Sequence, residues 1–113
     1  MNFTTAQSGG VSIVRVGDAR LSYPMLGEFS SVLSGLVAAG HRRIVVDLTP
    51  VTYVDSATIG CLMDVYRQLH AAGGALKLAS VQKRVETMLT MTGAQHFLEI
   101  HGDEQRAIAS FGG

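Results

Sequence analysis

The chain has 113 residues, of which 47% are apolar and 16% are charged, so it is long enough for one domain with an ordinary hydrophobic core. Nine basic and nine acidic side chains give a formal net charge of zero. This balance argues against direct nucleic-acid binding, because surfaces that follow nucleic-acid phosphates carry a basic excess. We therefore expect a single domain, residues 1–113, whose partners are other proteins.

The N-terminal residues, MNFTTAQSGG, lack the basic start and the apolar segment of a secretory signal. No apolar run is long enough to cross a bilayer. These features predict a cytoplasmic protein without membrane insertion. The single cysteine, Cys61, excludes an internal disulfide and a zinc site built from several cysteines. Its apolar neighbours predict a buried structural thiol.

The first forty residues predict two strands and a helix. Residues 2–7 and 11–16 are typical of strands, and Ser8-Gly9-Gly10 between them is typical of a tight turn. Pro24 suits the first turn of a helix. Apolar residues then recur every three or four positions as far as Ala39, and Gly40 ends the helix.

The centre of the chain predicts a buried strand followed by a capped helix. The continuous apolar stretch Ile44–Leu48 is expected in the middle of a sheet. Small polar residues at 55–58 follow, and an apolar stripe from Ile59 to Leu69 predicts a helix reaching about His70. Asp and Ser satisfy the free N–H groups of a first helical turn well. The junction therefore predicts a helix cap and also an exposed hydroxyl, and both can hold at once.

The last third of the chain predicts a strand, a helix, an edge strand and a final helix, at about residues 76–79, 80–92, 97–100 and 103–111. Ser80 and Asp103 are the expected caps of the two helices. The resulting order, β-β-α-β-α-β-α-β-α, predicts an α/β layered domain with a mixed sheet of four to five strands and about four helices. Binding sites in such sheets lie beyond the carboxyl ends of the strands, which here means the 55–58 junction.

The sequence contains no catalytic constellation. Ser56 stands in Val-Asp-Ser-Ala-Thr and lacks the flanking glycines of a nucleophile elbow. The glycine pairs lie at turns and form no nucleotide-binding loop. The four histidines, at positions 41, 70, 96 and 101, are not spaced as metal ligands. We expect them to be solvated. We therefore expect no enzymatic activity, no cofactor and no metal.

Met88 and Met91 have two interpretations. They could form an adaptable protein-binding patch, because methionine side chains are flexible and polarisable. Their helical spacing to Val85 and Leu89 makes core packing at least as good an interpretation for Met88.

From about Val11 to Ala109 the chain resembles STAS domains of the bacterial anti-sigma factor antagonist type. The strongest feature is the apolar strand Ile44–Leu48, a short loop, and then Asp55-Ser56 at the start of a helix. Three weaker features agree with the same family in order and spacing: Gly17-Asp18, Gly73-Gly74 and Thr92-Gly93 followed by Phe97.

The resemblance implies partner switching. In this family an unmodified antagonist binds an anti-sigma factor that is also a serine kinase, and so frees a sigma factor. The kinase phosphorylates the serine after the Asp, and a serine phosphatase reverses the modification. On this chain that serine is Ser56, with Thr58 as a less favoured acceptor. The implied protein is a monomer or weak dimer, and its implied partner-binding residues are Asp18, Asp47, Asp55, Ser56, Ala57 and Thr58.

Two segments depart from the family pattern. Asp-Ser-Ser/Thr-Gly-Leu-Gly is here Asp55-Ser56-Ala57-Thr58-Ile59-Gly60, so that Thr58 replaces a glycine. Gly-Glu-Leu-Asp after the second strand is here Gly17-Asp18-Ala19-Arg20, so that Arg20 replaces an acidic residue. The alternative function is a STAS scaffold or accessory subunit, in a stressosome-like assembly or beside a transporter, in which Ser56 is only structural.

Overall fold

The computed structural model describes residues 2–112 and contains one five-stranded sheet with the order β1-β2-β4-β6-β7. β1 and β2 are antiparallel, and every other neighbouring pair is parallel. The predicted mixed sheet is confirmed. Its strands are Phe3–Ser8 (β1), Val11–Val16 (β2), Arg43–Asp47 (β4), Ala75–Ala79 (β6) and Glu99–His101 (β7).

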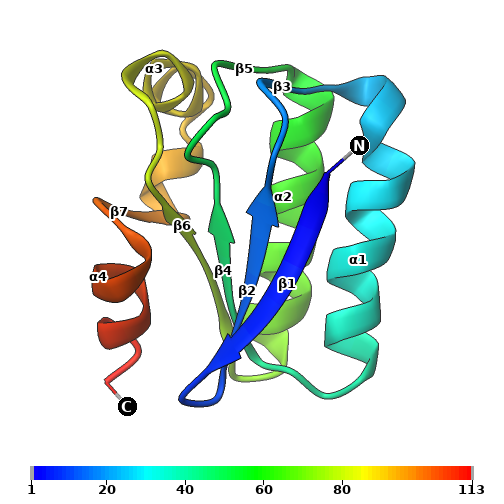
Figure 1. Ribbon diagram of the computed structural model, residues 1–113, viewed down its shortest axis with the longest axis vertical. Helices are drawn as coiled ribbons and strands as arrows, with labels where there is room; N and C mark the ends of the chain where they lie inside the picture. Colours follow the sequence, from blue (N-terminus) through cyan, green and yellow to red (C-terminus); the bar gives the residue numbers. More distant parts are fainter. Residues whose placement is uncertain (1, 113) are drawn as a thin grey trace.

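Residues 2–112 contain four α-helices, as predicted. Figure 1 views the sheet edge-on, with α1 and α2 on one face and α4 on the other. α3 lies at the end of the molecule to which the arrows of β2 and β4 point. The helices are Leu26–Ala38 (α1), Ser56–Ala71 (α2), Lys83–Thr92 (α3) and Glu104–Ala109 (α4), and short 3₁₀ turns cover Tyr23–Met25 and Ala94–His96.

The apolar core is divided between the two faces of the sheet. The larger cluster lies under α1 and α2, where Val14 and Val46 of the sheet meet Phe29 and Leu62 of the helices. The smaller cluster lies under α4 and includes Val45. Side chains alternate between the faces of a strand, and both faces of β4 are covered. This is why a continuous apolar run correctly predicted a central strand.

Two short strands have no counterpart in the predicted order. Arg20–Leu21 (β3) and Tyr53–Val54 (β5) form a separate parallel pair, which the backbone N–H of Thr52 extends by donating to Ala19 O at 2.8 Å. Two-residue strands are too short to show an alternating pattern. This pair connects the end of β2 to the segment that precedes α2.

The prediction that Ser80 caps α3 is wrong. Ser80 has φ 58°, and its N–H donates to His101 O, so it continues the contact between β6 and β7. α3 begins at Lys83, with Gln82 in the capping position. The last strand is also shifted from the predicted 97–100 to Glu99–His101, because the 3₁₀ turn Ala94–His96 takes up the preceding residues. Asp103 caps α4 as predicted, accepting a bond from Arg106 N.

No helix within residues 2–112 is both long and apolar enough to cross a bilayer.

Candidate partner-binding site

Asp55 is the residue that caps α2. Its Oδ1 atom accepts a bond from Thr58 N at 2.9 Å and lies 2.7 Å from the Thr58 hydroxyl oxygen, and its Oδ2 atom accepts a bond from Tyr23 N at 2.8 Å. Burial acts to raise the pKa of Asp55, but these hydrogen bonds outweigh it and lower the pKa below the usual range. The cap is therefore a carboxylate that also fixes the segment before α1 against the start of α2.

Ser56 is the first residue of α2 and is exposed. Because Asp55 satisfies the helix end, the Ser56 side chain is not needed as the cap. The N-terminus of a helix carries a partial positive charge, which favours an anion at this position. Ala57 beside it is half-buried. A hydroxyl at this position is accessible to a modifying enzyme, and an attached phosphate would gain from the helix dipole.

Thr58 is completely buried, in contrast to Ser56. Its hydroxyl lies 2.8 Å from Leu21 O and 2.7 Å from Asp55 Oδ1, and so links β3 to the start of α2. The interpretation of Thr58 as a second phosphate acceptor and as a partner contact does not fit this burial. Its role in the folded domain is structural.

An apolar groove between α2 and α3 adjoins Ser56. It has a volume of about 220 Å³ and is lined by Ser56, Ile59, Met88, Met91 and Thr92. The Met91 side chain is 81% exposed, whereas Met88 packs partly against the core. The two interpretations of the methionines thus apply to different residues: Met88 packs partly against the core, and Met91 is exposed at the groove. Sequence spacing alone could not separate them.

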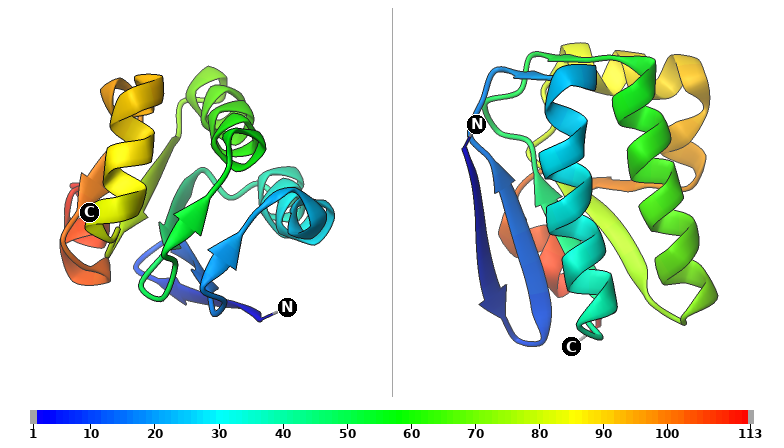
Figure 2. Two further views of the ribbon diagram at one scale, coloured as in Figure 1. Left: turned by 90° about the horizontal axis from the view of Figure 1, so that it is seen from above. Right: turned by 90° about the vertical axis from the view of Figure 1, so that its right-hand side faces the viewer.

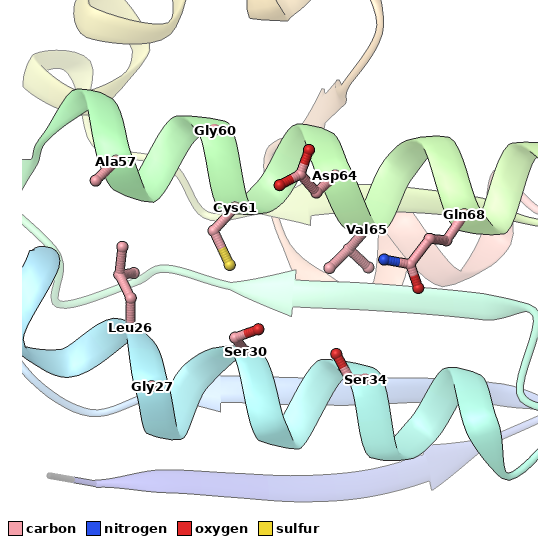
Figure 3. A pocket seen from close by; sticks show the side chains of 10 residues that line it. All are labelled: Leu26, Gly27, Ser30, Ser34, Ala57, Gly60, Cys61, Asp64, Val65 and Gln68. Carbon is pink, nitrogen blue, oxygen red and sulfur yellow. The ribbon is translucent and has the colours of Figure 1, made fainter.

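A second hollow, of about 460 Å³, lies on the other side of α2, against α1 (Figure 3). Much of its lining consists of small residues, among them Gly27, Ser30 and Gly60. Figure 3 shows the Cys61 sulfur pointing toward α1. Cys61 is therefore half-buried at this hollow and not fully buried as predicted, and burial raises the pKa of its thiol. The first turns of α2 form a ridge between the two hollows.

The two remaining predicted aspartates lie apart from this ridge. Asp18 is half-buried after β2, where it accepts a bond from Asn2 N at 3.0 Å. Asp47 is only 9% exposed, on the α4 face of the sheet, and accepts a bond from Thr49 N at 2.9 Å. Burial, together with the neighbouring Glu104, raises the pKa of Asp47. Asp47 therefore belongs to the contact between the sheet and α4, and its burial does not fit the predicted partner contact.

An aromatic and basic patch beside the site was not predicted. The Arg20 guanidinium lies 4.4 Å from the centre of the Tyr53 ring, across the β3–β5 pair. Tyr23, whose N–H binds Asp55, is 74% exposed. Only the departure from the family pattern at Arg20 pointed to this region. The pairing of two-residue strands that creates the patch left no signal in the sequence.

Within the described part of the chain, residues 2–112, no group of three or more His, Cys, Asp or Glu side chains could hold a metal ion. His70 and His96 are exposed, as predicted, but His41 and His101 are half-buried. His101 Nε2 lies 3.1 Å from Glu99 Oε1.

Sequence comparison finds relatives with related names. BtrV of Bordetella bronchiseptica, named as a candidate anti-sigma factor antagonist, is 26% identical over 84 residues, which are 74% of this chain and 72% of that protein. A candidate anti-sigma factor antagonist of Thermotoga neapolitana is 26% identical over 69 residues, 61% of each chain. The latter match thus spans less than two thirds of the Thermotoga protein.

Solved structures share the fold. An anti-sigma factor antagonist domain of Planctomyces limnophilus has a TM-score of 0.89 at 16% identity over 98% of both chains. The phosphorylated form of the Bacillus cell fate determinant SpoIIAA has a TM-score of 0.75 at 16% identity, covering 97% of this chain and 99% of that one. Murine Slc26a9, an anion transporter, matches at a TM-score of 0.77 and 17% identity over 92% of this chain but 18% of its own.

The family model of the STAS domain matches residues 2–107, which is nearly the whole chain. The chain therefore belongs to the STAS domain family.

Proposed function

We propose that this protein is a non-enzymatic anti-sigma factor antagonist that binds an anti-sigma factor with serine kinase activity, and that phosphorylation of Ser56 ends the binding. The observation that carries the proposal is the exposed Ser56 hydroxyl at the N-terminus of α2, two residues before the buried Thr58. The names of the relatives from Bordetella and Thermotoga support the class of partner.

The surface around Ser56 has the features of a docking site for a protein. Exposed Met91 and half-buried Met88 would be the apolar contacts, since methionine is enriched in interfaces, and buried Ile59 forms the floor of the groove between them and Ser56. The groove beside them is large enough for one apolar side chain of the partner. On the other side of the ridge, Gly60 presents no side chain and allows close approach. We expect the anti-sigma factor to cover this ridge and its groove together.

Phosphorylation would act on this interface by charge. A phosphoserine carries about −1.5 to −2 charges at neutral pH. The N-terminus of α2 stabilises such an anion by roughly 0.3–1 kcal/mol at an exposed site, while the neighbouring Asp55 carboxylate repels it. The free domain therefore keeps its fold after modification. The bound partner would have to bury an unpaired dianion beside an apolar groove, which is strongly unfavourable.

A kinase assay tests the proposal. The purified protein is incubated with ATP and with each serine-kinase anti-sigma factor of the same organism, and its intact mass is measured. We expect a phosphate-sized mass increase that Ser56→Ala abolishes. Thr58→Val is the matched control, because it removes the nearby hydroxyl that is buried, and we expect it to keep the mass increase. A mass increase that survives Ser56→Ala would contradict the assignment of the acceptor.

A scaffold or transporter-accessory role is the second candidate, and the match to part of Slc26a9 is the observation that favours it. In that role Ser56 would not be modified. Sedimentation of the free protein as an assembly far larger than a dimer, together with no modification by any kinase, would favour the scaffold over the phosphorylation switch.

A further inference from the structure

The two edges of the main sheet differ in how they are protected. β7, at one edge, has only three residues and carries the acidic Glu99, whose side chain lies 3.1 Å from that of His101. β1, at the other edge, has six residues with the sequence FTTAQS and contains no charged residue and no proline. Natural sheets usually protect an edge with charges, proline or a very short strand, because free backbone groups pair with other chains. β1 has none of these protections.

The register of the β1–β2 hairpin determines which backbone groups of β1 are free. The two-residue turn Gly9-Gly10 makes Ser8 and Val11 a hydrogen-bonded pair. The bond from Gly17 N to Asn2 O, 2.7 Å long, confirms that the even-numbered residues of β1 bond to β2. In an antiparallel pair the residues between them point their N–H and C=O groups outward. These are Phe3, Thr5 and Gln7, whose outward groups no other described residue between 2 and 112 binds.

We propose that β1 pairs with β1 of a second copy of this chain, antiparallel and about a two-fold axis at Thr5. Thr5 then lies opposite Thr5 of the second copy, and Phe3 lies opposite Gln7. Each of these positions is an outward-facing one, so each facing pair exchanges two hydrogen bonds. The outcome is one continuous sheet through two domains.

The side chains of β1 favour a second copy over an unrelated peptide. Thr4, Thr5 and Gln7 are exposed and neutral, so two identical strands meet without repulsion between like charges. Phe3 is fixed by its contact with Phe29, at 5.5 Å between ring centres, and so the edge is already ordered.

The position of β1 leaves room for the second copy. In the right-hand view of Figure 2, β1 is the outermost element, and α1 lies between it and α2. Pairing at β1 therefore leaves Ser56, at the start of α2, open on both copies. The dimer would present two partner sites, and its existence does not depend on the proposed function.

Analytical ultracentrifugation over a concentration series up to ~1 mM tests the dimer. We expect the wild type to show a reversible monomer–dimer equilibrium. Thr5→Pro removes an outward N–H and not a β1–β2 bond, so it should weaken the dimer more than tenfold while circular dichroism shows an unchanged fold. A wild type that stays monomeric throughout, or a dimer that survives Thr5→Pro, would overturn the proposal.

A charge-swap pair tests the two-fold axis itself. Thr5→Lys and Thr5→Glu each place like charges opposite each other, so each variant alone should dimerise more weakly than the wild type. An equimolar mixture of the two should regain a dimer, now between unlike copies. Thr4→Lys with Thr4→Glu is the matched control, because residue 4 does not face itself across the axis. Equal recovery in the Thr4 mixture would show a different register and refute the pairing at Thr5.

Discussion

Three neighbouring polar residues at the start of α2 have separate tasks. Asp55 caps the helix and accepts a hydrogen bond from Tyr23 N. Thr58 is buried, and its hydroxyl lies 2.8 Å from Leu21 O. Ser56 between them remains exposed. The helix end is therefore satisfied without Ser56. We therefore expect that the Ser56 side chain can change without loss of the fold.

Asp55→Ala should lower the free energy of unfolding at pH 7 by about 1–2 kcal/mol, the usual cost of removing an N-cap. The pKa of Asp55 is lowered in the folded protein. Its stabilisation is therefore complete above the unfolded-state pKa of about 3.9 and is lost as the pH falls through the lower folded-state pKa. Urea denaturation at pH 7 and about pH 3 measures the free energy of unfolding of the variant and of the wild type at each pH. The prediction fails if the difference in this free energy between Asp55→Ala and the wild type is as large at the lower pH as at pH 7.

Thr58→Val should destabilise the domain by about 1–3 kcal/mol, because the variant leaves the buried Leu21 carbonyl without its partner. Thr52→Val is the matched control. It removes a longer bond, 3.2 Å from the hydroxyl to Ala19 O, at a half-buried residue, and should cost less. Equal costs in urea denaturation would show that the Thr58 hydroxyl has no special structural role.

At the scale of single elements, α2 contains a glycine that the fold does not require. A Cβ atom added at Gly60 would meet no atom within 4 Å. Gly60→Ala should therefore raise the free energy of unfolding by about 0.5–1 kcal/mol, because glycine is unfavourable inside a helix. If the partner covers the ridge, the same methyl group should weaken its binding.

Gly35→Ala in α1 is the control for Gly60→Ala. A Cβ atom there also meets nothing within 4 Å, but Gly35 lines neither hollow. We expect it to stabilise the domain without changing partner affinity, as measured by isothermal titration calorimetry. If both variants leave the affinity unchanged, the partner does not approach α2 at Gly60.

α4 is attached to the sheet by an ion pair as well as by apolar contacts. Arg15 donates to both carboxylate oxygens of Glu104, at 2.7 and 2.9 Å, and this pairing lowers the pKa of Glu104 to about 2. The stabilisation from Glu104 is therefore complete above its unfolded-state pKa of about 4.3 and is lost as the pH falls toward 2.

Glu104→Gln should make the stability less dependent on pH between about 4.3 and 2, as followed by thermal unfolding across that range. Asp64→Asn is the control, because it breaks an ion pair with Arg67 in which both side chains are mostly exposed and which stabilises little. An unchanged pH profile in Glu104→Gln would show that the contact of α4 with Arg15 does not contribute to acid sensitivity.

The elements that the sequence predicted best are those with long, one-sided patterns. β4 and α2 have five and sixteen residues with clear apolar runs or stripes, and both were located within about one residue. β3 and β5 were missed, because their two residues have no periodicity. Ser80 was misassigned as a cap, because its residue type suits one, but its backbone joins the sheet instead.

The same physical limits apply to the candidate site. Asp55 and Ser56 follow from local residue type and from the resemblance to the family. The burial of Thr58 depends on β3, and the burial of Asp47 depends on α4. Predicting either burial therefore requires knowledge of contacts between segments that are far apart in the chain. A local sequence pattern does not contain this information.

At the scale of the whole molecule, the domain is expected to act as a rigid body with one modifiable surface. Ser56 lies outside both core clusters. Ser56→Asp should leave the melting temperature nearly unchanged, since an added carboxylate gains from the helix N-terminus and loses to Asp55 by similar amounts. A large loss of thermal stability, measured by differential scanning calorimetry, would show that modification acts by unfolding the domain and not at an interface.

The most direct measurement is the affinity of the anti-sigma factor kinase for this protein before and after stoichiometric phosphorylation, with Ser56→Ala carried through the same treatment. We predict that phosphorylation weakens binding by more than tenfold and that Ser56→Ala binds like the unmodified protein at both stages. Equal affinity for the phosphorylated and unmodified forms would contradict the account.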